Sequence, residues 1–157
     1  MRDLLTLVGV AVDDPLALYQ DYLPHYEESW TAYDDVVGAL DELDHAGIRL
    51  AVLTNGRQAQ QVAKLDRMGV LDRFEVVLAA SDLPAFKPSP LAFAALCESM
   101  GERPEAVAYV GDDLSADVDG AGAAGLIPVW LDRQLVGGGR TDVATIATLA
   151  ELMVVLE

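Results

Sequence analysis

The feature that most constrains the fold is a regular alternation of short apolar runs with segments of helical periodicity. Four apolar runs are typical of strands, at residues 48–53, 74–79, 106–110 and 127–131. The segments between them have apolar positions at the spacing of a helix face. Strands that alternate with helices indicate right-handed crossovers and a parallel sheet. The fold class is therefore α/β, a Rossmann-like parallel sheet, and the chemistry is expected beyond the carboxyl ends of the strands.

Helix boundary signals place the remaining elements. Asp14 followed by Pro15 opens a helix that runs to about residue 29, with Asp as the cap and Pro at the first helical position. Asp34 or Asp35 caps a second helix, which Gly47 ends. The pattern predicts further helices at 57–68, 89–100, 115–124 and 143–152.

Charge and hydropathy exclude several classes of partner. The chain has 157 residues, which suit one compact domain, and a formal net charge of −16. A field of this sign repels phosphate backbones and anionic lipids, so we expect no nucleic-acid and no membrane partner. No apolar run reaches the roughly 18 residues of a membrane span, and residues 4–12 lead into Asp13-Asp14 rather than a cleavage site. We therefore expect a cytoplasmic protein.

The acidic composition has two explanations. Acidic residues number 26 against 10 basic ones, and Lys64 and Lys87 are the only lysines. An Asp-rich, Lys-poor surface stays solvated in concentrated salt, which favours a halophilic source. A genome with GC-rich codons would also favour Arg over Lys. The size of the charge favours the first explanation.

Small polar residues follow the first predicted strand. The loop Thr54-Asn55-Gly56 lies between a buried strand and a helix N-terminus. Its backbone N–H groups and the Thr54 hydroxyl could hold an anion, helped by the helix dipole. Thr and Asn are also good helix caps, and this motif taken alone favours ordinary capping.

A lysine held between prolines follows the second predicted strand. Lys87 precedes Pro88, which favours extended geometry, and Pro90 begins the next helix. An ammonium fixed at a strand end suits the neutralisation of a phosphate. Taken alone, a solvated lysine in a proline turn explains the pattern equally simply.

Four carboxylates follow the third predicted strand within residues 112–119. Asp112 comes directly after the strand, whereas Asp113 and Asp117 are four apart and share a helix face, at a cost of about 0.2–0.5 kcal/mol. Capping accounts for Asp113 but not for Asp112 at the strand end. A divalent cation such as Mg²⁺ accounts for both, because it binds carboxylate oxygens and keeps several waters.

Taken in order, these three loops resemble the haloacid dehalogenase-like (HAD) hydrolase superfamily, in the branch with a helical cap inserted after the first core strand. LTNG at 53–56 is similar to the second family motif, KPSP at 87–90 to the third, and GDDLSADVDGAGAAG at 111–125 to the fourth. The resemblance runs from about residue 14 to 152 and implies a remnant of the cap at residues 1–32 and a core at 33–157.

The resemblance also implies roles for the first two loops. Thr54 would hydrogen-bond the transferring phosphoryl group, the Asn55 backbone would assist, and Gly56 would belong to the same substrate-binding loop. Lys87 would neutralise the phosphate and the attacking carboxylate. The implied substrate is a small phosphorylated metabolite.

In the third loop the resemblance implies that Asp112 ligates Mg²⁺, and that Asp113 and Asp117 act behind it, orienting Lys87 or a metal-bound water. Relatives that dehalogenate without a metal usually lack this acidic site. The chain therefore resembles a Mg²⁺-dependent phosphatase more than a dehalogenase.

The family nucleophile is missing from the pattern. It is the first Asp of an Asp-x-Asp-x-Thr motif after a first core strand, and no such motif occurs in these 157 residues. We therefore expect a chain that begins inside the cap, an incomplete site and little or no phosphatase activity. The alternative to an enzyme is an inactive fragment or a binding module without turnover.

In the family that the chain resembles, the missing strand lies between the strands that carry LTNG and GDD, so its absence would leave two half-sheets with bare edges. One hypothesis is that residues 4–12 form a replacement strand, within the chain or exchanged between protomers of a homodimer. The other interpretation, that this segment ends a cap helix, is favoured.

Overall fold

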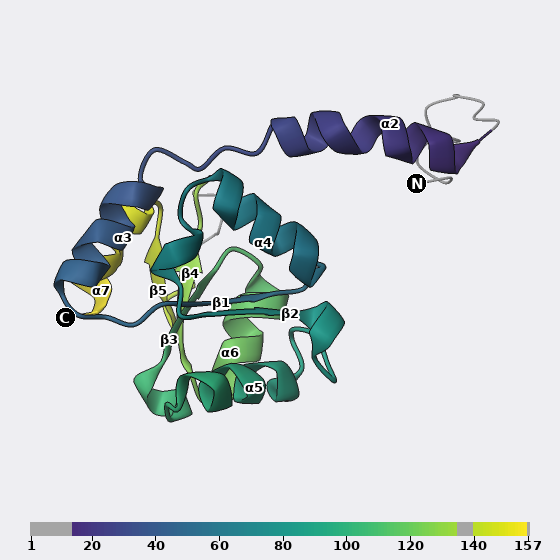
Figure 1. Ribbon diagram of the computed structural model, residues 1–157. Coiled ribbons are helices and arrows are strands. Elements are labelled where there is room, and N and C mark those ends of the chain that lie inside the picture. The colour runs from purple at the N-terminus through teal and green to yellow at the C-terminus, as the bar shows by residue number, and fades with distance from the viewer. Residues whose placement is uncertain (1–13, 135–139, 157) are drawn as a thin grey trace. The chain divides into compact units, whose positions relative to one another are not determined.

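The computed structural model describes residues 14–134 and 140–156 (Figure 1). Residues 4–12, for which we considered a replacement strand, lie outside this part. The chain divides into two compact units, Met1–Thr31 and Ala32–Glu157. The assignment of the first unit to a helical cap stays a prediction. No helix of the described residues is long and apolar enough to cross a membrane.

In the first unit the described element is helix α2, Pro15–Glu28. Its predicted start is confirmed, because the Asp14 carboxylate accepts hydrogen bonds from two first-turn backbone N–H groups and Pro15 occupies the first turn. Aromatic side chains four residues apart contact one another along the helix. Tyr22 stacks on Tyr26, and Tyr26 meets Trp30 edge to face.

The second unit confirms the alternation of strands and helices over most of its length. Its strands are β1 Ala51–Thr54, β2 Val76–Ala79, β3 Ala108–Gly111, β4 Ile127–Leu131 and β5 Ala144–Ile146. Its α-helices are α3 Val36–His45, α4 Gln58–Arg67, α5 Pro90–Met100, α6 Gly120–Ala123 and α7 Leu152–Leu156.

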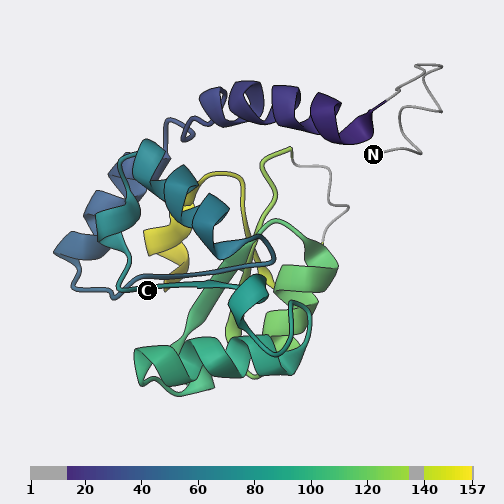
Figure 2. The ribbon, with the colours of Figure 1, turned by 45° about the vertical axis from the view of Figure 1, so that its right-hand side comes forward.

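All the described strand pairs are parallel, but they form two sheets. Strands β1 and β2 pair in one sheet, and β3, β4 and β5 pair in that order in the other. Helix α4 covers one face of the β1–β2 sheet and α5 covers the opposite face (Figures 1 and 2). The division into two sheets agrees with the two half-sheets that a missing first strand would leave. That residues 4–12 supply a replacement strand stays a prediction.

Two clusters of apolar side chains form the core of this unit. The larger cluster joins the two sheets, because it contains Leu53 of β1, Tyr109 of β3 and Phe93 of α5. The smaller cluster packs Val129 of β4 and Ile146 of β5 against the helices on that side. The carboxyl ends of β1 and β3 are therefore fixed to the same core, although no backbone ladder connects them.

The predicted helix at 143–152 is wrong. Residues Ala144–Ile146 form strand β5, which pairs with β4, and a short 3₁₀ turn leads to α7 at Leu152. The segment contains Val143, Thr145 and Ile146, which are β-branched, and Ile146 is completely buried beside β4. Pairing with β4 therefore determines the secondary structure of this segment, because the segment is too short for its periodicity to distinguish a helix from a strand.

The predicted helix at 115–124 is present but not regular. Its first part, Leu114–Asp119, is a π-helical turn in which the Val118 N–H reaches back five residues to the Asp113 carbonyl. Helix α6 then continues for one turn. Single π-turns inside helices are frequent at functional sites, and this one directly follows β3.

Candidate active site

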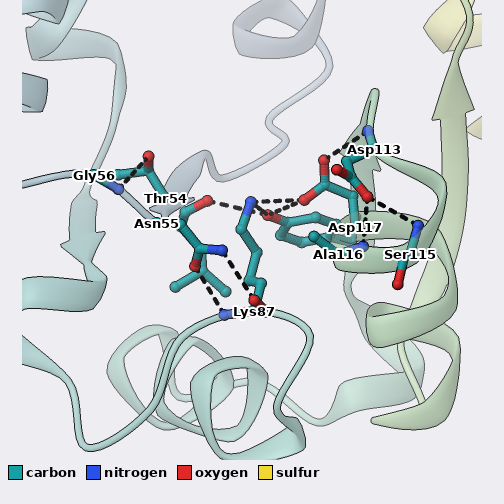
Figure 3. A network of polar contacts seen from close by, with 10 residues as sticks. Thr54, Asn55, Gly56, Lys87, Asp113, Ser115, Ala116 and Asp117 are labelled. Carbon is teal, nitrogen blue, oxygen red and sulfur yellow. Dashed lines mark hydrogen bonds and ion pairs between the residues drawn. The ribbon is translucent and has the colours of Figure 1, made fainter. Parts of the chain in front are cut away.

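The Thr54-Asn55-Gly56 loop and the Lys87 loop are tied together by the Asn55 side chain. Asn55 Nδ2 donates to the Lys87 carbonyl (2.9 Å), and the Lys87 N–H donates to Asn55 Oδ1 (2.8 Å) (Figure 3). The Thr54 hydroxyl oxygen accepts from the Gly56 N–H (3.3 Å). The N-cap of α4 is instead Arg57, without a side-chain cap, so the ordinary capping interpretation of Thr54 and Asn55 is wrong.

The Lys87 ammonium points away from solvent and toward β3. Its Nζ donates to Asp117 Oδ1 at 2.6 Å and to the Tyr109 hydroxyl at 2.9 Å (Figure 3). The side chains of Lys87 and Asp117 are only 12% and 7% exposed. The interpretation of Lys87 as a solvated residue of a proline turn is therefore wrong. An ammonium has three donors, so one remains for a ligand.

Asp117 is held by groups on both of its oxygens. While Oδ1 binds Lys87, Oδ2 accepts from the backbone N–H of Asp113 at 3.1 Å. Gly111 makes room for this carboxylate, because a Cβ at that position would lie closer than 3.0 Å to the Cβ, Cγ and Oδ2 of Asp117. Asp117 contacts Lys87 directly, and its role in orienting Lys87, which the resemblance implies, stays a prediction.

Asp113 and Asp112 differ in their hydrogen-bond partners. Asp113 Oδ1 accepts from the N–H groups of Ser115 (2.9 Å) and Ala116 (2.7 Å), and so caps the π-turn. Asp112 is exposed, its carbonyl accepts from Trp130 Nε1, and its carboxylate makes no hydrogen bond or ion pair with the described residues. Of the three, Asp112 is the one whose carboxylate has neither oxygen hydrogen-bonded to the described residues.

The carboxylates of this loop fit a magnesium ion that is bound by few protein ligands. The described residues contain no cluster of three or more metal-binding side chains. However, Mg²⁺ is commonly bound by one or two carboxylates, with waters and substrate phosphates as the remaining ligands. Asp112 supplies one such carboxylate at the strand end.

Tyr109 is a site residue that sequence reasoning missed. Its hydroxyl accepts from Lys87 Nζ and donates to the Leu53 carbonyl at 3.0 Å. Burial, and next the Asp117 carboxylate, raise the pKa of this phenol far above its usual value, so it stays neutral. In the sequence, a tyrosine within an apolar strand does not indicate that its hydroxyl contacts a lysine of the site.

Comparison with known proteins assigns the chain to a family. Residues 3–125 match the haloacid dehalogenase-like hydrolase family. The chain belongs to this family. It is 35% identical to a ribulose-1,5-bisphosphate 5-phosphatase of Halopiger xanaduensis over 119 residues, which are 76% of this chain and 50% of that protein. It is also 34% identical to (S)-2-haloacid dehalogenase 4A of Burkholderia cepacia, over 78% of this chain and 52% of that protein.

Solved structures of HAD-like hydrolases share the fold. A HAD phosphatase from Thermococcus onnurineus superposes with a TM-score of 0.78 at 33% identity, over 97% of this chain and 68% of that one. The putative HAD-hydrolase YfnB from Bacillus subtilis, bound to magnesium, gives a TM-score of 0.86 at 26% identity, over 98% and 67% of the two chains. The chain spans about half the length of the curated relatives it matches.

Proposed function

We propose that this HAD-like hydrolase is built for Mg²⁺-dependent hydrolysis of a small phosphomonoester, with part of the catalytic site missing from these 157 residues. The observation that carries the proposal is the buried Lys87 ammonium, which is paired with Asp117 and keeps one donor free beside the Thr54 loop. A fixed cation at the carboxyl edge of a parallel sheet suits the charge of a phosphoryl group.

Different residues of this chain would bind different oxygens of the phosphoryl group. The Thr54 hydroxyl would hydrogen-bond a phosphoryl oxygen while its own oxygen stays fixed by the Gly56 N–H. The third donor of Lys87 would bind another oxygen, and Asn55 ties the Lys87 backbone to the Thr54 loop. Asp112 would hold Mg²⁺, which when bound supplies charge neutralisation for the phosphoryl oxygens.

A phosphatase is favoured over a dehalogenase by the acidic loop after β3. The relatives include both kinds of enzyme at similar identity, so similarity alone does not separate them. The free carboxylate of Asp112 has a use in binding a cation beside a phosphate, but it would repel a carboxylate substrate such as a haloacid.

The second candidate is a binding module without turnover. The sequence observation that favours it is the lack of an Asp-x-Asp-x-Thr motif, which carries the attacking carboxylate in the family. Such a module would retain affinity for Mg²⁺ and phosphate through Asp112 and Lys87.

Two measurements on this chain test for turnover and for binding. The first is hydrolysis of an aryl phosphate with Mg²⁺, beside the Asp112→Asn variant; turnover that vanishes in the variant would establish a complete enzyme. The second is calorimetric binding of inorganic phosphate with Mg²⁺. Binding without turnover supports the incomplete site, and the absence of binding would refute both candidates. In the binding measurement, Lys87→Met should remove the affinity for phosphate. Lys64→Met is the matched control, because Lys64 lies on α4 without a side-chain hydrogen bond to the described residues.

A further inference from the structure

The Tyr109 hydroxyl occupies the point where the two sheets and the candidate site meet. It lies 2.9 Å from Lys87 Nζ, 3.0 Å from the Leu53 carbonyl oxygen and 3.5 Å from Asp117 Oδ1. Tyr109 is 8% exposed and belongs to β3, whereas Leu53 belongs to β1 of the other sheet. This hydroxyl therefore joins two strands that no backbone ladder connects.

The direction of each hydrogen bond follows from the available protons. The Lys87 ammonium can only donate, so the Tyr109 oxygen accepts from it. The single hydroxyl proton must then go to a second oxygen. The Leu53 carbonyl at 3.0 Å is a better acceptor position than Asp117 Oδ1 at 3.5 Å. The result is a directed chain from Lys87 Nζ through the phenol to the backbone of β1.

That chain relates Lys87 to the loop that would bind the phosphoryl group. Leu53 is the residue before Thr54, so the acceptor of the phenol is next to the proposed phosphoryl-binding hydroxyl. Asp117 alone would allow the ammonium to rotate about one contact. The phenol supplies a second fixed point, and Nζ also lies 5.5 Å from the centre of its ring. Two contacts leave one donor direction, which is fixed relative to β1.

We propose that Tyr109 is a positioning residue that holds the Lys87 ammonium at a set distance from the Thr54 loop. The proposal rests on the proposed function in one respect: the ligand that the oriented donor would meet is a phosphate. The phenol does not itself exchange a proton, because burial keeps it neutral, and its role is to fix geometry.

Tyr109→Phe is the variant that tests this role. It keeps the ring, which meets Phe93 edge to face with centroids 5.1 Å apart, and removes only the hydroxyl. The matched control is Tyr33→Phe, because the Tyr33 ring stacks on Arg133 and the residue is 66% exposed. Unfolding in urea shows whether each variant is folded under the conditions of the experiment.

The chain offers a direct readout, because it contains only two lysines. Acetylation of each by acetic anhydride, followed by peptide mass spectrometry, gives the ratio of the Lys87 rate to the Lys64 rate. Lys64 serves as an internal reference. In Tyr109→Phe the Lys87 ammonium loses one hydrogen bond. This loss should raise the ratio of acetylation rates about tenfold or more. The ratio should not change in Tyr33→Phe.

Binding of inorganic phosphate with Mg²⁺ provides the second readout. We expect Tyr109→Phe to weaken it several-fold while the folded fraction stays the same, and saturating phosphate to protect Lys87 less than in the unchanged chain. An unchanged acetylation ratio in folded Tyr109→Phe would overturn the positioning role. If the unchanged chain binds no phosphate, the proposed function fails, but the acetylation ratio still decides the role of Tyr109.

Discussion

Gly111→Ala should disrupt the candidate site from a position that has no side chain in it. A Cβ at Gly111 would lie closer than 3.0 Å to three atoms of Asp117, whereas carbon atoms in contact are about 3.5–4.0 Å apart. Asp117 or strand β3 must therefore move by at least about 0.5 Å. The Lys87–Asp117 hydrogen bond is 2.6 Å long and joins two buried charges, so it tolerates little displacement.

Two limiting cases give the range of free energy of unfolding that Gly111→Ala should lose. If the strand shifts and the ion pair survives, the cost is that of an overpacked core, about 1–3 kcal/mol. If Asp117 rotates away and leaves the Lys87 ammonium without its carboxylate, the cost rises to about 3–5 kcal/mol. Urea unfolding followed by circular dichroism measures this difference as a change in midpoint at a constant slope.

The control is Gly38→Ala on α3. Gly38 is an exposed helical glycine, and a Cβ there meets no atom within 4 Å. Alanine should stabilise this position by about 0.5–1 kcal/mol. A Gly111→Ala protein that unfolds at the same urea concentration as the unchanged chain would refute the reasoning.

A double-mutant cycle identifies the cause of the loss. In an Asp117→Gly background the clashing Cβ, Cγ and Oδ2 atoms are gone, so Gly111→Ala should cost at least about 1 kcal/mol less than it does in the unchanged chain. Equal costs in the two backgrounds would mean that the methyl group acts through the backbone of β3 and not through Asp117.

Three further predictions concern charge and metal binding. Lys87→Met should abolish calorimetric binding of inorganic phosphate, whereas Lys64→Met should leave it unchanged; equal effects of the two would contradict the site. MgCl₂ with phosphate should raise the thermal midpoint of the unchanged chain but not of Asp112→Asn, as measured by scanning calorimetry. The hydrogen bonds from Arg133 lower the pKa of Asp35, whose carboxylate also accepts from the Leu149 N–H. A lowered folded-state pKa gives stability that is present above the unfolded value of 3.8 and is lost as the pH falls through the folded value. Acid unfolding should therefore steepen below about pH 4, and Asp35→Asn should reduce that dependence; an identical pH profile would show that the pair contributes nothing.

The loops of the site were predictable because their positions depend on a simple rule. Thr54, Lys87 and Asp112 each come soon after an apolar run, and the carboxyl ends of parallel strands meet at one edge. The order of the elements up to β4 follows from the same alternation. The resemblance also predicts the division into two sheets, because a missing first strand would leave two half-sheets. It does not predict β5 beside β4, because strand adjacency is a tertiary property.

The partners of individual side chains were less predictable than their positions. Asn55 was assigned a backbone role, but its amide clamps the Lys87 backbone, which lies 32 residues away. The sequence predicts Asp34 or Asp35 as the cap of α3; Asp35 takes that position, yet its carboxylate binds Arg133, which lies 98 residues away. Contacts of this range depend on how separate loops converge, and local residue patterns carry no information about them.

Three of the four aspartates after β3 show how neighbouring like charges can be compensated in different ways. Residues 113 and 117 share a helix face, an arrangement that costs energy when both carboxylates face solvent. In the structure Asp117 turns inward to the Lys87 ammonium, and Asp113 turns to the N–H groups of the π-turn, where the helix dipole favours it. Each charge is therefore compensated locally, and Asp112 keeps its carboxylate exposed. Because one carboxylate binds Mg²⁺ weakly, the phosphate held by Lys87 and Thr54 would have to complete the coordination, so metal and substrate should bind together rather than independently.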